Sequence, residues 1–251
     1  MAREHGSWDD EMATLLVDAN QMCRPVIGQE SERGCRASLR AARALVHQQH
    51  LQEAEELCVE TLTRMVEGPA ELTLVAEAQT HLAGVLAKQQ RFEESFECYA
   101  RAAELYGEVE VSPAGILWLA GVRASMGLVQ ERMGAMEPAL LQYQQALELY
   151  EKHLGSWHAR VGGVLVAMAG GCQRLGRRSE ALRLYLRALA VFSGPSAAGA
   201  RTSCAGGRVQ PYRLALRAGV APLVVPQGHR LVQRGLADLG HREVEALLGT
   251  E

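Results

Sequence analysis

Few of the residues that perform acid–base, nucleophilic or metal chemistry are grouped in this chain of 251 residues. His47 and His50 stand three apart, a spacing at which two imidazoles could share a metal, but no third ligand accompanies them. His241, Glu243 and Glu245 alternate, which on a helix spreads them over different faces. We interpret both groups as solvated surface and expect no metal, no cofactor and no catalytic residue.

Sequence motifs of the common enzyme classes are absent. The chain has no phosphate-binding loop, no dinucleotide-binding glycine pattern, and neither H-E-x-x-H nor G-x-S-x-G. An enzyme would therefore need a convergent polar pocket that the sequence does not reveal. The cysteines are irregularly spaced without a C-x-x-C pair, so we expect reduced, buried thiols. They are Cys23, Cys35, Cys58, Cys98, Cys172 and Cys204.

The charge distribution argues against nucleic acid as a partner. The net charge is −3, with 19 basic and 25 acidic side chains in residues 1–192 and 7 and 4 in residues 193–251. The acidic N-terminus lacks the apolar core of a signal peptide. The longest apolar stretch, residues 161–172, is shorter than the ~20 residues of a membrane helix. These features predict a soluble cytoplasmic protein without membrane insertion.

A short pattern of small and bulkier residues recurs four times. In each set a small residue is followed four positions later by a bulkier one and three further by a small one. The first members stand 41, 44 and 42 residues apart, a period typical of helical solenoids built from helix pairs. The sets are Ala54, Cys58, Thr61; Ser95, Tyr99, Ala102; Ala139, Tyr143, Ala146; and Ala181, Tyr185, Ala188.

Offsets of four and seven place each set on one stripe of a helix, where small side chains let a neighbouring helix approach. A second apolar segment precedes each set, and we expect it to form helix A before helix B. The chain should reverse five residues before each set, at Gln49, Gln90, Gly134 and Gly176, because glycine ends helices in a left-handed conformation without strain. The tyrosines should be core residues rather than stacking platforms for bases.

The expected helix pairs occupy about 31–67, 71–107, 114–153 and 158–192. They resemble the tetratricopeptide repeat, and the connecting sequence resembles the kinesin light chain subclass, with its L-G-x-x-H-P-x-V-A connection. Ala159 replaces the proline of that pattern, and Val166 and Ala167 replace its paired asparagines. The matching residues are Leu154, Gly155, His158, Val161, Ala169, Gly176, Glu180, Ala181, Tyr185, Arg187, Ala188 and Leu189. The resemblance implies an all-α, right-handed solenoid of about four helix pairs.

Both ends of the chain fall outside the repeat register. Residues 1–30 should contain one helix, either half of a degenerate repeat or a plain capping helix. Residues 193–251 begin with a Gly/Ser-rich linker and continue as a capping helix pair or as an unrelated tail. Four glycines in the expected helix A of the last pair, at 162, 163, 170 and 171, indicate either close approach of another backbone or helix, or a frayed terminal repeat.

The resemblance also implies a concave wall of A helices that binds an extended peptide or a helix. The family's groove-facing positions fall here on Arg36, Leu39, Arg43, Glu77, Thr80, Leu128, Glu131, Val166 and Gln173. The Lys/Asn clamp by which some such domains hold chaperone C-termini has no counterpart, since Asn20 is the only asparagine. The long coiled coil of the motor subunit is also missing from the first 30 residues.

We therefore predict a non-catalytic adaptor or scaffold that binds a partner polypeptide in this groove. Arg36 and Arg43, seven residues apart and so on one helix face, would bind an acidic peptide by charge-assisted hydrogen bonds. The alternative is an assembly or regulatory subunit that acts through its convex surface or its C-terminal tail. In that case the chain's own C-terminal segment would occupy the groove.

Overall fold

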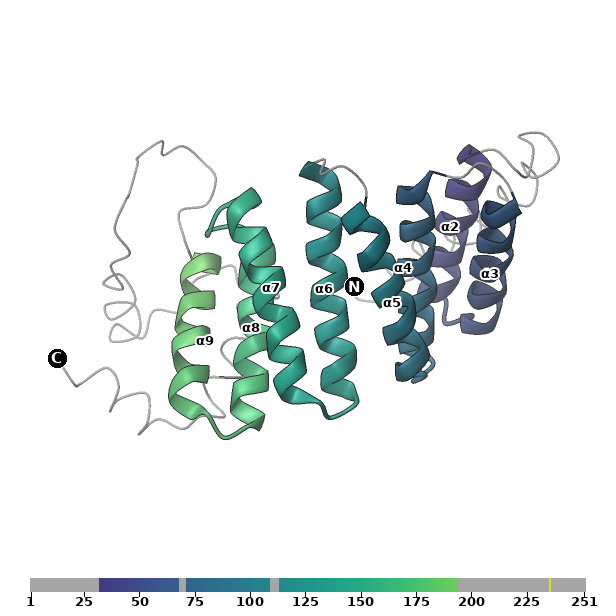
Figure 1. Ribbon diagram of the computed structural model, residues 1–251. Helices are drawn as coiled ribbons and strands as arrows, with labels where there is room; N and C mark the ends of the chain where they lie inside the picture. The colour runs from purple at the N-terminus through teal and green to yellow at the C-terminus, as the bar shows by residue number, and fades with distance from the viewer. Residues whose placement is uncertain (1–31, 68–70, 109–112, 194–234, 236–251) are drawn as a thin grey trace, which may run out of the picture. The chain divides into compact units, whose positions relative to one another are not determined.

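The computed structural model describes residues 32–67, 71–108, 113–193 and 235, and these contain α-helices and turns but no strand (Figure 1). The expected all-α repeat fold is confirmed. The helix expected within residues 1–30 lies outside the described residues, as does the tail except for Ser193 and Gly235. The helices follow one another as α2 (Glu32–His47), α3 (Leu51–Glu67), α4 (Leu72–Lys88), α5 (Phe92–Glu108), α6 (Pro113–Arg132), α7 (Met136–Leu154), α8 (Ala159–Arg174) and α9 (Arg178–Ser193).

Four tight turns separate the two helices of each pair, and each contains a residue with positive φ. These residues are Gln49 and Gln90, both at 66°, Gly134 at 85° and Gly176 at 74°. After Gln49, Gln90 and Gly176, the next backbone N–H donates to the carbonyl five residues back at 2.9 to 3.0 Å. This is the Schellman arrangement that satisfies the last carbonyls of a helix. The two glutamines adopt the left-handed conformation at a cost of about 1–2 kcal/mol that the glycines avoid.

The chain divides into two compact units, residues 1–133 and 134–251. Unit 1 contains α2 to α6, and its helices pack through small residues of the repeated sets. Ala54, Ser95 and Ala102 are fully buried. The Ser95 hydroxyl donates to the carbonyl oxygen of Ala83 at 2.8 Å, which joins α5 to α4 and satisfies a buried polar group. Short side chains at these positions therefore let the paired helices lie close together.

Tyrosines of the repeated sets are buried in both units, as predicted. Tyr99, Tyr143 and Tyr185 are 7%, 2% and 5% exposed. In unit 1, Tyr106 packs against Trp118 of α6 with the ring centroids 5.8 Å apart. Burial raises the pKa of Tyr106 to about 12, and a hydrogen bond with Thr80 opposes that shift. The aromatic positions are therefore packing residues and are not exposed for stacking on bases.

Unit 2 contains α7, α8 and α9, and the structure explains two of the four α8 glycines. A Cβ on Gly162 would lie 2.6 Å from the Cζ of Phe192, and one on Gly171 would lie 3.1 Å from a methyl carbon of Leu140. Both glycines therefore permit close approach by side chains of α9 and α7. A Cβ on Gly163 would meet nothing within 4 Å. Helix α8 runs without a break from Ala159 to Arg174, and close packing accounts for Gly162 and Gly171.

Ion pairs connect successive helix pairs on the surface of each unit. In unit 1, Arg91 in the α4–α5 turn contacts Glu55 of α3 at 2.7 Å and Glu94 at 2.5 Å. In unit 2, Arg177 pairs with Glu137, and Arg187 pairs with Glu151. Each exposed pair contributes at most about 1 kcal/mol, so these contacts support the packing rather than determine it.

Candidate functional site: a basic pocket in unit 1

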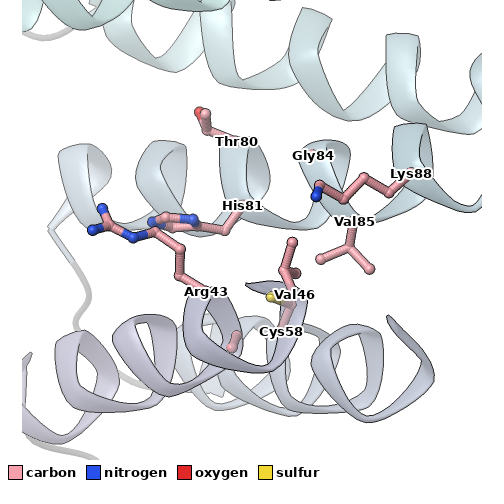
Figure 2. A pocket seen from close by; sticks show the side chains of 9 residues that line it. Arg43, Val46, Cys58, Thr80, His81, Gly84, Val85 and Lys88 are labelled. Carbon is pink, nitrogen blue, oxygen red and sulfur yellow. The ribbon is translucent and has the colours of Figure 1, made fainter. Parts of the chain in front are cut away.

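A pocket of about 160 Å³ lies among α2, α3 and α4 in unit 1 (Figure 2). Its apolar lining includes Val46, Cys58 and Val85. The full lining is Ala42, Arg43, Val46, Cys58, Thr80, His81, Gly84, Val85 and Lys88. The volume is below the ~300–1,000 Å³ of typical small-molecule sites, so the pocket suits one side chain of a larger partner.

Three basic side chains line this otherwise apolar pocket. Figure 2 shows Arg43 from α2 and His81 from α4 at one end, with Lys88 reaching back along α4 from the other. Arg43 and Lys88 are exposed, and neither has an ion-pair partner among the described residues. His81 lies 3.8 Å from the carboxylate of Glu77. The pocket therefore combines an apolar surface with two positive charges that no described carboxylate neutralises.

The Cys58 thiol in the pocket wall is suited to packing rather than to nucleophilic chemistry. Its side chain is 0% exposed, and burial raises its pKa to about 12, with the nearby Glu55 carboxylate adding to the shift. A thiol with such a pKa stays protonated at neutral pH and cannot act as a thiolate nucleophile. The four cysteines among the described residues are free and buried: Cys35, Cys58, Cys98 and Cys172. Cys23 and Cys204 lie outside the described residues.

The two arginines expected to bind an acidic peptide differ in their surroundings. Arg36 contacts Glu32 at 2.7 Å and Glu71 at 3.5 Å, so its charge is largely compensated within α2 and by the start of α4. Arg43 lines the pocket. Leu39, which lies between them on α2, is only 1% exposed and belongs to the core. Of these three residues, Arg43 is thus the one available to a ligand.

Some side chains on α4 and α6 that were expected to face the groove make contacts within the protein. Thr80 donates its hydroxyl to the Ala76 carbonyl at 2.8 Å. The nearby His81 imidazole holds the pKa of Glu77 below its usual range, and this effect outweighs the opposing effect of burial. On α6, Leu128 is 50% exposed and Glu131 is half-buried. Helix α4 contacts both α2 and α6, so these three helices are neighbours in unit 1.

Val166 and Gln173 belong to α8 in unit 2 and take no part in the pocket. Both are half-buried, and Gln173 accepts a hydrogen bond from the Tyr185 phenol at 3.2 Å.

The residues expected from the sequence to face the groove did not include His81 or Lys88. The positions 77, 81, 84 and 88 repeat at intervals of four, three and four, which is one helix face. Arg43 and Thr80, which were expected to face the groove, do line the pocket beside them. A search for basic residues in register with Gly84 would have found His81 and Lys88.

Other kinds of site find little support in the part of the chain that the structure describes. No three His, Cys, Asp or Glu side chains gather there as metal ligands. Its helices are also too short or too polar for any of them to cross a bilayer.

The fold defines a helical-repeat protein with a pocket among α2, α3 and α4 of unit 1. Residues 74–152 match the tetratricopeptide repeat family. No curated protein matches the sequence. Residues 74–152 thus contain tetratricopeptide repeats, and the fold of the chain is similar to that of kinesin light chain-like repeats, as the sequence predicted.

Solved structures support this assignment at the level of the fold. BtubC (BKLC) from P. vanneervenii is 15% identical with a TM-score of 0.64, over 98% of this chain and 93% of that one. A putative kinesin light chain from Podospora anserina with nearly identical TPR-like repeats is 17% identical with a TM-score of 0.62, over 75% and 89% of the two chains. The apo form of RapI is 13% identical with a TM-score of 0.61, over 92% of this chain and 59% of RapI.

Proposed function

We propose that this protein is a non-catalytic adaptor that binds an acidic segment of a partner polypeptide at the unit 1 pocket. The observation that carries the proposal is the pairing of an apolar pocket with two cations, Arg43 and Lys88, for which the described residues offer no ion-pair partner. An aliphatic side chain of the partner would fill the space between Val46 and Val85. Flanking carboxylates would then reach the guanidinium and ammonium groups.

The chemistry of the pocket favours a peptide over a small molecule or nucleic acid. Its volume accommodates one side chain, while the wall formed by α2, α4 and α6 offers a longer surface on either side. Two cations suit a short acidic stretch, whereas a nucleic-acid site needs a larger basic surface. The tetratricopeptide fold is consistent with a protein partner. We also propose that the protein acts in the cytoplasm.

The test compares fluorescein-labelled peptides that carry a central leucine flanked by glutamates with peptides in which lysines replace the glutamates. Anisotropy titrations at low and physiological salt should show binding of the acidic peptide alone, weakened by salt. The double variant Arg43→Ala/Lys88→Ala should weaken binding by about 5- to 30-fold, because two exposed charge pairs contribute about 1–2 kcal/mol.

The matched control is Arg183→Ala/Lys152→Ala, which removes one arginine and one lysine from exposed positions of unit 2. It should bind the acidic peptide as the unmodified chain does. Equal affinity of both double variants, or equal binding of the two peptides, would exclude the pocket as the binding site. Binding should also require an intact apolar surface, so Val46→Asp should abolish it while the helical circular dichroism persists.

A further inference from the structure

Gly84 lies inside α4 at a place where the packing of unit 1 does not require a glycine. Among the described residues outside its own stretch of helix, a Cβ here would meet only the phenol oxygen of Tyr99 within 4 Å. That contact is 3.6 Å long, which is an ordinary van der Waals distance. By contrast, a Cβ on Gly162 or Gly171 would lie within 3.1 Å of a neighbouring side chain. Alanine would therefore fit at position 84, and it would favour the helix more than glycine does.

The space that a side chain at position 84 would take belongs to the pocket of unit 1. Gly84 is part of the pocket lining, together with Val46 of α2 and Val85 of α4 (Figure 2). Its neighbours Ala83 and Val85 are 0% and 2% exposed, whereas Gly84 is half-buried. The accessible side of a helical residue is the side on which its Cβ stands, since side chains point away from the helix axis. A methyl group added to Gly84 would therefore take up part of the pocket.

The pocket volume of about 160 Å³ limits the side chain that a partner can insert. A cavity of about 150 Å³ holds a hydrocarbon of six carbons, so the pocket has room for the four carbons of a leucine side chain. A methyl group on Gly84 would reduce that room, and overpacked apolar contacts are unfavourable. The single methyl group of an alanine side chain would still fit.

We propose that Gly84 determines the size of the partner side chain that the pocket accepts. Because position 84 has no side chain, the pocket admits a leucine-sized aliphatic group, and a larger residue there would restrict the site to small ones. This inference rests on the proposed adaptor function, and it specifies the partner further. Arg43 and Lys88 select acidic segments, and Gly84 selects those whose central residue is a bulky aliphatic one.

The test measures two peptides against the unmodified protein and Gly84→Ala by fluorescence anisotropy at one salt concentration. One peptide has a central leucine flanked by glutamates, and the other has alanine in place of the leucine. The unmodified protein should bind the leucine peptide about 10-fold more tightly, because three additional carbons leave water. In Gly84→Ala this preference should fall to about 2-fold or less, through weaker binding of the leucine peptide alone.

Stability distinguishes this role of Gly84 from a structural one. Because alanine fits and favours the helix, Gly84→Ala should unfold at a higher urea concentration than the unmodified protein while it binds the leucine peptide less tightly. The matched control is Gly163→Ala in unit 2, where a Cβ meets nothing within 4 Å. It should also gain stability, but it should bind both peptides as the unmodified protein does.

Equal binding of the two peptides to the unmodified protein would overturn the size selection and leave the adaptor proposal intact. The same holds if Gly84→Ala keeps the full preference for leucine. A Gly84→Ala variant that is less stable and binds neither peptide would show that the glycine is structural, which also refutes the inference. If the unmodified protein binds neither peptide, the adaptor proposal fails, and the inference that rests on it fails too.

Discussion

Adjacent glycines of α8 should respond in opposite ways to the same substitution. Gly162 and Gly163 both lie inside the helix, so replacing either with alanine gains up to about 1 kcal/mol of helix propensity. At Gly163 the new methyl group meets nothing within 4 Å, and that gain should appear as increased stability. At Gly162 the methyl carbon would lie 2.6 Å and 2.8 Å from two ring carbons of Phe192.

The Gly162 methyl group must displace the Phe192 ring, and overpacking of this kind costs about 1–3 kcal/mol. Subtracting the propensity gain leaves Gly162→Ala destabilised by up to about 2 kcal/mol, whereas Gly163→Ala is stabilised by about 0.5–1 kcal/mol. The two variants should therefore differ by about 1–3 kcal/mol in the free energy of unfolding. Urea denaturation followed by far-ultraviolet circular dichroism measures this difference as a shift of midpoint at constant slope.

A double-mutant cycle identifies the cause of the difference. Phe192→Ala alone should destabilise the protein by loss of packing, but Gly162→Ala should cost nothing further when the ring is absent. The reasoning fails if Gly163→Ala is as destabilising as Gly162→Ala. It also fails if the cost of Gly162→Ala is the same with and without the Phe192 ring, because the clash would then not be the cause.

Two further predictions concern the core of unit 2 and the pH dependence of the stability of unit 1. Ala181 is fully buried, so Ala181→Arg should destabilise unit 2 by more than about 2 kcal/mol through overpacking and an unpaired buried charge. The comparison is Arg183→Ala at an exposed position of the same helix, and equal thermal midpoints for the two variants would contradict the packing. The lowered pKa of Glu77 means that its contribution to stability is present above the unfolded value of about 4.3 and is lost as the pH falls through the lower folded value. Glu77→Gln should remove that part of the acid dependence in urea titrations between about pH 3 and pH 6, and an unchanged pH profile would show that the His81 contact contributes nothing.

Much of the fold follows from local sequence pattern. The spacing of Ala139, Tyr143 and Ala146 predicts one packing stripe because a helix repeats every 3.6 residues, whatever surrounds it. The reversals at Gly134 and Gly176 follow from the backbone preference of one residue type. The all-α repeat architecture was therefore accessible from the sequence, as was the burial of the aromatic positions.

The candidate site was less accessible because it depends on the rotation of each helix. Successive residues of a helix point about 100° apart, so whether His81 and Lys88 reach the pocket depends on how α4 is rotated against α2. The sequence likewise does not reveal that Leu39 faces the core while Arg43 lines a pocket. Both outcomes are decided by how the faces of α2 and α4 pack against each other.

By itself, the sequence determined the period, the helix type and the places where the chain turns, because each depends on residues within a few positions of one another. Only the tertiary structure decided which charges are compensated and which glycines are needed. Arg36 is paired with Glu71, 35 residues further along the chain, and Gly162 faces a ring 30 residues further along. The physical reason is that charge compensation and close packing depend on distances between helices, which small shifts in crossing angle and rotation change by several ångströms.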